Sequence, residues 1–145
     1  MDKPVHILLV EDNEDDIIIL KEVLTKHNIG QDLSTVRDGD EALDYIFKRG
    51  IYTGVTTPDL VLLDLNLPRK NGMEVLKEVR NNVAYKYLPI IVLSTSSSPD
   101  DITESYQKHA NCFITKPSDI TSLDNMVQEI KSFWLKTAQL PNQYV

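Results

Sequence analysis

The chain has 145 residues, of which 41% are hydrophobic and 26% are charged, a composition typical of one globular domain with one core. Fifteen Lys and Arg residues against 22 Asp and Glu residues give a net charge of −7, which disfavours binding to the phosphate backbone of nucleic acids. The single cysteine, Cys112, cannot form a disulfide within the chain, and no apolar run is long enough for a signal peptide or a membrane span. We therefore expect a cytoplasmic protein that binds neither nucleic acid nor membrane.

Five short apolar segments recur along the chain. Four of them are rich in Val, Ile and Leu without alternating polar residues, a pattern typical of strands buried on both faces of a parallel sheet. These four are residues 5–10, 60–63, 90–93 and 112–114. The fifth segment, residues 33–36, alternates apolar and polar residues and is expected to be an edge strand.

Helical patterns lie between these segments, with apolar residues three and four positions apart. Four apolar stripes are clear: Ile17, Leu20, Val23 and Leu24; Ala42, Leu43, Ile46 and Phe47 before a stop at Gly50; Met73, Leu76 and Val79; and Ile120, Leu123, Val127, Ile130 and Trp134 behind caps at Ser118 and Asp119. The remaining helix, from about 100 to 109, has few apolar residues (Ile102, Tyr106 and Ala110), so we expect it to be held loosely.

This alternation of strands and helices predicts an α/β fold, a doubly wound (βα)5 domain with a five-stranded parallel sheet and helices on both faces. No repeat, low-complexity tract or linker divides the sequence. We therefore expect one domain over residues 1–136 and a short C-terminal tail over residues 137–145, with no output domain.

Polar residues follow the predicted strands at the edge where ligands bind to parallel sheets. Glu11 and Asp12 follow the first strand, and Asp64 closes the third. Ser94 follows the fourth strand and Lys116 the fifth. Each residue alone has a structural explanation as a helix cap, a turn residue or a solvated side chain. Together they place three carboxylates, a hydroxyl and an ammonium group around one crevice.

Such a set of groups has a defined chemistry. Carboxylates without histidine or thiol form an oxygen site suited to Mg²⁺, and a lysine and a hydroxyl opposite them would neutralise phosphoryl oxygens. A carboxylate at the centre would then attack phosphorus. Asp59 precedes the third strand and is expected at its opposite end, about 17 Å away, whereas His6 inside the first strand is expected to be a packed core residue. The glycine spacing excludes a dinucleotide fingerprint and a phosphate-binding loop.

Three motifs at this edge resemble those of two-component response regulator receiver domains of the CheY type. They are residues 8–12 (LLVED), residues 62–68 (LLDLNLP) with Gly72, and residues 114–117 (ITKP), and the resemblance covers about residues 4–136. It implies a sheet in the strand order 2-1-3-4-5 and a Mg²⁺ cofactor. It also implies phosphorylation by a sensor histidine kinase, in a protein that catalyses only its own phosphorylation and dephosphorylation and is not otherwise an enzyme.

The resemblance assigns roles to the carboxylates and their neighbours. Asp64 would be the phosphoacceptor, and Lys116 would pair with the phosphoryl group. Asp12 would bind Mg²⁺ directly, with Glu11 acting through water. Asp64 and the main-chain carbonyl of Asn66 would complete the protein ligands.

The resemblance also implies a switch made of Ser94 and Phe113. Ser94 would supply the hydroxyl that moves to the phosphoryl group, and Phe113 occupies the position where many family members have tyrosine. Its movement would change the face formed by the fourth helix, the fifth strand and the fifth helix. The Lys116–Pro117 bond is expected to be cis, as in the family.

Segments outside the site, residues 51–58, 111–113 and 132–135, are similar to the single-domain regulators paired with bacterial phytochrome kinases. This similarity implies a phytochrome-like kinase as partner, while no residue identifies the downstream protein. A metal-dependent phosphatase or other hydrolase with Asp64 as nucleophile stays open as the alternative. That class would want a second acid two residues later, where this chain has Asn66.

The end of the chain carries apolar residues without an evident internal use. Phe133 is rotated by about 100° from Trp134 along the helix, so both rings cannot face one core. Leu140 and Tyr144 continue the apolar pattern in the tail. We expect a homodimer through the fourth helix, fifth strand and fifth helix, as in the phytochrome-linked regulators. The alternative is that Phe133 packs under the tail within one monomer.

Overall fold

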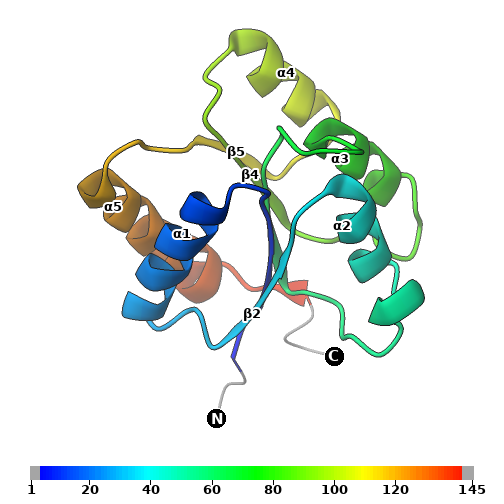
Figure 1. Ribbon diagram of the computed structural model, residues 1–145, viewed down its shortest axis with the longest axis horizontal. Helices are drawn as coiled ribbons and strands as arrows, with labels where there is room; N and C mark the ends of the chain where they lie inside the picture. The colour runs from blue at the N-terminus through cyan, green and yellow to red at the C-terminus, as the bar shows by residue number, and fades with distance from the viewer. Residues whose placement is uncertain (1–3, 142–145) are drawn as a thin grey trace.

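The computed structural model describes residues 4–141 and confirms the predicted (βα)5 architecture (Figure 1). The strands are β1 His6–Val10, β2 Asp32–Val36, β3 Leu60–Leu63, β4 Ile90–Ser94 and β5 Cys112–Thr115. The α-helices are α1 Glu14–Lys26, α2 Gly39–Ile46, α3 Gly72–Arg80, α4 Pro99–Gln107 and α5 Ile120–Ile130, with a 3-10 helix η1 at Gly50–Tyr52 and a π-helix η2 at Lys131–Thr137. All pairs are parallel, and the strand order is β2-β1-β3-β4-β5, as the family resemblance implied.

Two apolar layers enclose the sheet. Alternate residues of the central strands point to opposite faces. Ile7 and Leu9 of β1 pack toward α1 and α5, whereas Leu8 and Val10 pack toward α2 and α3. Figure 1 shows α1 and α5 together on one side of the sheet and α2 and α3 on the other. Every side chain of β1, β3 and β4 is buried, while β2 and β5 at the sheet edges are half-buried, which explains the alternating pattern of residues 33–36.

All five α-helices begin at the edge of the sheet where the strands end. A side chain caps each of them by accepting a hydrogen bond from a backbone N–H three residues later: Asn13, Asp38, Asn71, Ser98 and Asp119. The loops between strands and caps are short, so polar residues in them stay next to the strand ends. Within residues 4–141 no helix is long and apolar enough to cross a membrane.

Helix α4 is attached to the rest of the domain more weakly than the other helices. Of its side chains only Ser105 is buried, and Figure 1 shows the helix standing at the periphery of the molecule. The predicted apolar face is poor: Tyr106 is about half exposed, and its hydroxyl accepts a hydrogen bond from the backbone N–H of Phe113 at 3.1 Å. The expectation of a loosely held helix is confirmed.

Three local expectations about the helices were wrong. Ile120 is 67% exposed, because it is the first residue of α5 and lies ahead of the part that meets the core, and Met126 is buried instead. Helix α2 stops at Ile46 without Gly50, since Lys48 itself adopts the left-handed conformation at φ 58°. The tail residue Leu140 is 4% exposed and therefore has an internal use, while Tyr144 lies outside the described residues.

The Lys116–Pro117 bond also differs from expectation. All peptide bonds of the described residues are trans, this one included. The expectation of a cis bond was therefore wrong for this structure, in keeping with the general preference of X-Pro bonds for trans by about 0.5–1 kcal/mol.

Candidate functional site

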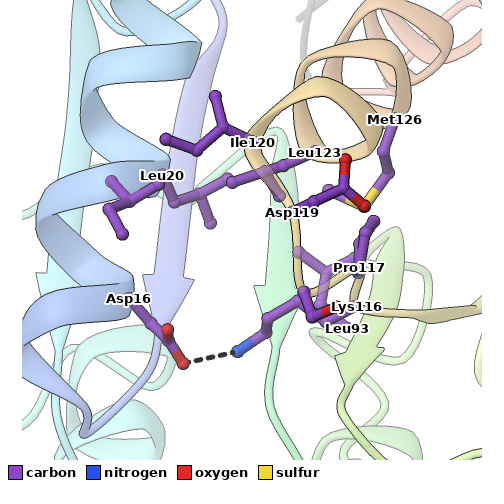
Figure 2. A pocket seen from close by; sticks show the side chains of 11 residues that line it. Asp16, Leu20, Leu93, Lys116, Pro117, Asp119, Ile120, Leu123 and Met126 are labelled. Carbon is purple, nitrogen blue, oxygen red and sulfur yellow. Dashed lines mark hydrogen bonds and ion pairs between the residues drawn. The ribbon is translucent and has the colours of Figure 1, made fainter.

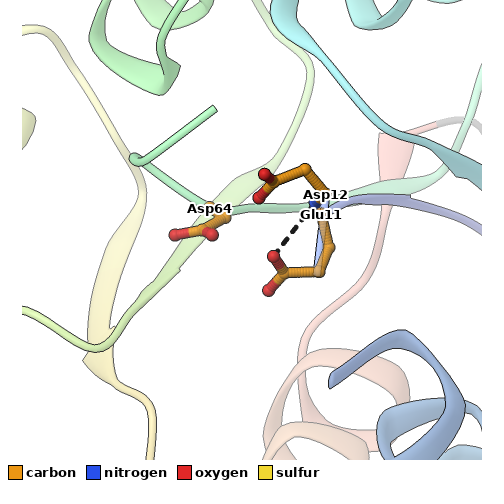
Figure 3. A group of neighbouring side chains, drawn as sticks. All are labelled: Glu11, Asp12 and Asp64. Carbon is orange, nitrogen blue, oxygen red and sulfur yellow. Dashed lines mark hydrogen bonds between the residues drawn. The ribbon is translucent and has the colours of Figure 1, made fainter. Parts of the chain in front are cut away.

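Three carboxylates meet at the C-terminal edge of the two central strands. Val10 of β1 pairs with Leu63 of β3, so the residues that follow them end side by side. One oxygen from each of Glu11, Asp12 and Asp64 lies within 4.8 Å of the others, and Figure 3 shows the three side chains converging. Within residues 4–141 this is the one group of three or more acidic, histidine or cysteine side chains close enough to share a metal ion.

Glu11 is buried and held in place on both of its oxygens. Its Oε2 accepts hydrogen bonds from the backbone N–H groups of Asp12 at 3.0 Å and Asn13 at 3.2 Å. Its Oε1 accepts a hydrogen bond from Lys116 Nζ. Burial by itself raises the pKa of Glu11, but the Lys116 hydrogen bond and charge, with the Asn13 N–H, hold that pKa below its ordinary value. Glu11 is therefore ionised at neutral pH.

Asp64 sits beside this fixed negative charge with less compensation. Its side chain is buried, and the backbone N–H of Asn66 donates to Oδ1 only at a long 3.4 Å. Burial, followed by the charge of Glu11, raises the pKa of Asp64 from 3.8 to about 7, although Lys116 acts in the opposite direction. The site therefore holds more negative charge than its own cation neutralises, which favours a positively charged ligand.

Lys116 is the cation of the site. Burial lowers the pKa of its ammonium group, but the hydrogen bond to Glu11 and the charges of Asp64 and Asp16 outweigh burial and raise it. Lys116 Nζ lies 3.4 Å from Asp16 Oδ2, the contact drawn in Figure 2. Sequence reasoning missed Asp16, which lies in the first turn of α1, directly after the loop that carries Glu11 and Asp12. An apolar pocket between α1 and α5 lies next to this contact (Figure 2).

The two predicted switch residues lie on neighbouring strands. Ser94 closes β4 and is fully buried, and its Oγ accepts a hydrogen bond from the backbone N–H of Ser96 at 3.1 Å. Phe113 in β5 is half-buried and pairs with Val92. The backbone carbonyl of Ser94 accepts from the Lys116 N–H at 2.6 Å, which ties the end of β4 to the end of β5.

The loop after β3 fixes Asn66 at the mouth of the site. Asn66 is exposed, and its role as a ligand through the main-chain carbonyl stays a prediction. Gly72 at the start of α3 packs directly on this loop, and a Cβ there would come within 2.4 Å of the backbone oxygen of Asp64. Only glycine allows α3 to approach Asp64 this closely, and the Gly72 N–H donates to the Leu65 carbonyl at 2.9 Å.

The donor set fits a hard divalent cation. All three side chains offer carboxylate oxygens, and the described residues place no histidine or cysteine ligand among them. Oxygen-only sites with one or two carboxylates and open positions bind Mg²⁺ or Mn²⁺, whereas zinc prefers nitrogen and sulfur. Burial, and after it the charge of Glu11, raises the pKa of Asp64, and a divalent cation would favour the ionised carboxylate there.

Comparison with known proteins identifies what this arrangement resembles. The family model described as "Response regulator receiver domain" matches residues 7–128. Response regulator Rcp1 of Synechocystis sp. is 45% identical over 138 residues, which cover 95% of this chain and 94% of Rcp1. The probable methanogenesis regulatory protein FilR2 of Methanothrix harundinacea is 37% identical, covering 91% of this chain and 84% of FilR2.

Two solved structures share the fold of this chain, and one of them is described as bound to a divalent metal ion. The phosphorylated cyanobacterial phytochrome response regulator RcpA superimposes with a TM-score of 0.91 and 46% identity, covering 96% of this chain and 99% of RcpA. The Mn²⁺-bound form of Rcp1 gives a TM-score of 0.88 with 45% identity, covering 95% of this chain and 99% of Rcp1. Rcp1 thus binds a divalent metal, the class of ligand that the acidic cluster fits.

Proposed function

This chain belongs to the response regulator receiver family, and from that membership we propose that it accepts a phosphoryl group on Asp64 from a sensor histidine kinase. The observation that carries the proposal is the position of Asp64: a buried carboxylate at the end of a central strand, with Glu11, Asp12 and Lys116 around it. The cation would be Mg²⁺, held by Glu11, Asp12, Asp64 and the main-chain carbonyl of Asn66, and it would neutralise charge on the carboxylates and on phosphoryl oxygens.

In the transfer, a carboxylate oxygen of Asp64 attacks the phosphorus of a phosphohistidine. A P–O bond forms, the P–N bond breaks, and the imidazole nitrogen leaves with the electron pair. Lys116 exchanges part of its contact with Glu11 for the phosphoryl oxygens. Glu11, held by two backbone N–H groups, keeps its position during this exchange. The residues thus supply positioning and charge neutralisation, and the protein catalyses its own phosphorylation without turning over an external substrate.

The alternative, a hydrolase with Asp64 as nucleophile, has less support. Aspartyl phosphatases use a second acidic residue two positions after the nucleophile. This chain has Asn66 at that position, an exposed amide that cannot act as an acid. The relatives named above are regulators by description. A hydrolase would turn over a phosphate ester many times, whereas a receiver takes up one phosphoryl group per chain.

The phosphoacceptor is tested by labelling with acetyl phosphate and Mg²⁺. We expect Asp64→Asn to abolish labelling and Asp59→Asn to retain it. Asp59 is the matched control because it is also buried but lies before β3, at the opposite end of the strand, where it accepts a hydrogen bond from the His6 N–H at 2.8 Å. Full labelling of the Asp64→Asn protein would overturn the assignment, and multiple turnover by the wild type would support the hydrolase.

We further propose that Ser94 and Phe113 transmit the signal. A phosphoryl group on Asp64 attracts the Ser94 hydroxyl, and Phe113, half-buried in the edge strand β5, turns inward as the end of β4 moves. This change alters the face formed by α4, β5 and α5. Ser94→Ala should still be phosphorylated but should lose most of the amide shifts that beryllofluoride induces in α4, since alanine offers no donor. Equal shifts in both proteins would contradict the role of Ser94.

The same face is proposed to form a homodimer. Phe133 is 55% exposed and stacks edge-on against Trp134 with ring centroids 5.4 Å apart, so an aromatic pair is presented in η2, directly after α5. Its exposure disfavours the alternative in which Phe133 packs under the tail. Phe133→Ala should shift the protein toward monomer in sedimentation equilibrium with an effect of about 2 kcal/mol, whereas Ile51→Ala, at an 89% exposed site elsewhere, should not. A wild type that is monomeric at high concentration, with and without beryllofluoride, would exclude the dimer.

The proposed kinase partner is phytochrome-like. RcpA is described as a phytochrome response regulator, and it matches nearly the full length of this chain. A phosphotransfer profile against the histidine kinases of the source organism tests this choice. Preferred transfer from a kinase without a phytochrome-like sensor would contradict it.

A further inference from the structure

Helix α4 depends on its two ends for its position. Because Ser105 is its one buried side chain, apolar packing contributes little to holding it. Hydrogen bonds at the first turn and just beyond the last turn therefore decide where the helix lies. The two ends are held in different ways. The first turn is connected to Ser94, whereas near the last turn the Tyr106 hydroxyl accepts a hydrogen bond from the backbone N–H of the other switch residue, Phe113, at 3.1 Å.

The first end is tied to Ser94 through Ser96. The Ser96 backbone N–H donates to Ser94 Oγ at 3.1 Å. The Ser96 hydroxyl donates to Asp101 Oδ2 at 2.6 Å, a short hydrogen bond to a charged acceptor in the first turn of α4. The same hydroxyl oxygen accepts from the backbone N–H of the capping residue Ser98 at 3.2 Å. A continuous chain of hydrogen bonds thus runs from the switch hydroxyl to the start of the helix.

The far end is fixed by Arg80, a half-buried arginine of α3. Arg80 Nε donates to the carbonyl of His109, two residues beyond α4, at 2.8 Å. The same guanidinium donates to the carbonyls of Lys86 at 3.0 Å and Leu88 at 2.7 Å and to Asn111 Oδ1 at 3.0 Å. These four bonds connect the end of α4 to α3 and to the start of β4, and none of them involves the candidate site.

We infer that the Ser96–Asp101 hydrogen bond is a latch that holds the first turn of α4 in the unphosphorylated protein and opens when Ser94 turns toward a phosphoryl group on Asp64. The inference rests on the proposed function of Asp64 and Ser94. A Ser94 hydroxyl drawn to the phosphoryl oxygens moves away from the Ser96 N–H. Ser96 then follows or loses its acceptor, and in either case its hydroxyl leaves Asp101. The far end stays on Arg80, so α4 pivots about its C-terminal end.

The chain offers matched controls for both halves of the latch. Asp100 is adjacent to Asp101 and carries the same charge in the same first turn, but it is exposed and forms no hydrogen bond with Ser96. Ser97 is likewise an exposed neighbour of Ser96. Aspartate in a first turn also interacts favourably with the helix dipole, and Asp100→Ala controls for the loss of that interaction.

The first measurement uses amide hydrogen exchange in the unphosphorylated protein. The Ile102 N–H, which bonds to the Ser98 carbonyl at 3.0 Å, reports on the first turn, and the Lys108 N–H, which bonds to the Glu104 carbonyl at 2.9 Å, reports on the far end. We expect Asp101→Ala to raise exchange at Ile102 about tenfold over Asp100→Ala, with Lys108 unchanged. Ser96→Ala should act like Asp101→Ala, and Ser97→Ala like the wild type. Equal exchange at Ile102 in Asp101→Ala and Asp100→Ala would overturn the latch.

The second measurement adds beryllofluoride, a phosphoryl mimic, with Mg²⁺. In the wild type it should raise exchange at Ile102, whereas in Asp101→Ala, whose latch is already open, the additional rise should be less than about twofold. An equal rise in both proteins would overturn the link between latch and switch. Labelling of Asp64 by acetyl phosphate and Mg²⁺ is measured on the same proteins without beryllofluoride: its absence in the wild type would refute the proposed function, while the first measurement would still decide whether the latch exists.

Discussion

The two edges of the sheet both bury polar side chains, but they differ in how those side chains are paired. At the N-terminal edge, His6 bonds to Tyr45 Oη through Nε2 at 2.7 Å and to Thr56 Oγ1 through Nδ1 at 3.2 Å. Tyr45 in turn donates to Ser34 Oγ at 2.9 Å. At the C-terminal edge, Glu11 and Asp64 are buried side by side with one lysine to neutralise them.

This difference in pairing indicates that the polar residues at the N-terminal edge stabilise the fold, whereas those at the C-terminal edge are suited to binding a ligand. A buried polar group with a full set of partners contributes to stability, whereas buried like charges without a cation oppose it. The polar groups of the N-terminal edge are paired: the buried Asp59 accepts a hydrogen bond from the His6 N–H, and Arg80 donates to Leu88 and Asn111 next to the start of β4. The C-terminal edge is strained by charge in the isolated protein. Binding of a cation and then a phosphoryl group there is favoured because it relieves or redistributes that charge.

The largest effect on stability is expected from Arg80→Met, at the N-terminal edge. The substitution removes four hydrogen bonds, one to the carbonyl of the buried Leu88 and three to acceptors on exposed residues, where water can partly replace them. The loss, mostly from the Leu88 carbonyl, should lower the free energy of unfolding by about 2–4 kcal/mol in urea denaturation. Asp64 labelling by acetyl phosphate should persist under native conditions. Arg49→Met, at an exposed arginine that pairs with Asp44, should change stability much less. A similar loss of unfolding free energy in Arg80→Met and Arg49→Met would show that the Arg80 hydrogen bonds contribute no more to stability than an exposed ion pair.

Sequence periodicity predicted the fold well because apolar burial follows the period of strand and helix. The four residues of β3 were predicted to the residue, and the end of that strand put Asp64 at the edge where Glu11 and Asp12 also lie. The roles of these residues remain predictions. Exposure at helix ends was predicted poorly: Ile120 fits the apolar stripe of α5 but precedes the contact with the core.

What the sequence could not supply is the choice of partner for each polar side chain. Lys116 was expected near phosphoryl oxygens, but its orientation toward Glu11 and Asp16 depends on how the loop after β5 lies against the loop after β1 and the first turn of α1. The Ser96–Asp101 bond joins residues five apart in a serine-rich loop, where many pairings are sterically open. The raised pKa of Asp64 likewise comes from burial and from a neighbour 53 positions away in the sequence.

The effect of burial and of the Glu11 charge on Asp64 can be measured as a pH dependence of the free energy of unfolding. In the folded protein Asp64 keeps its proton up to about pH 7, whereas the unfolded chain loses it near pH 4, so the unfolded state binds fewer protons between these values. The metal-free wild type should therefore lose stability through Asp64 as pH rises from about 4 to about 7. Asp64→Asn lacks this loss, and its advantage over the wild type should grow by about 1–3 kcal/mol across that window and then stay constant.

This measurement is made by urea denaturation with a chelator present, and Mg²⁺ provides the internal control. Added Mg²⁺ should stabilise the wild type most at the upper end of the pH window and stabilise Asp64→Asn less, because the variant lacks one carboxylate ligand. A stability difference between Asp64→Asn and the wild type that is the same at about pH 4 and about pH 8 would show that the pKa of Asp64 is not raised in the folded protein.

The smallest effect is expected from Tyr45→Phe, which removes one hydroxyl and its two hydrogen bonds at the N-terminal edge without changing charge. The variant keeps the ring contacts with His6, at 5.9 Å between centroids, and with Tyr52, at 5.0 Å, but it removes the partner of His6 Nε2 and the donor to Ser34. We expect a loss of about 1–2 kcal/mol in urea denaturation and unchanged labelling of Asp64. Tyr52→Phe is the comparison: the Tyr52 hydroxyl donates to Glu41 at 2.7 Å and its pKa is raised to about 12, yet both groups lie nearer to solvent. Because water can replace the Tyr52–Glu41 hydrogen bond, Tyr52→Phe should lose less unfolding free energy than Tyr45→Phe. A larger loss for Tyr52→Phe would show that burial does not decide which hydroxyl contributes more to stability.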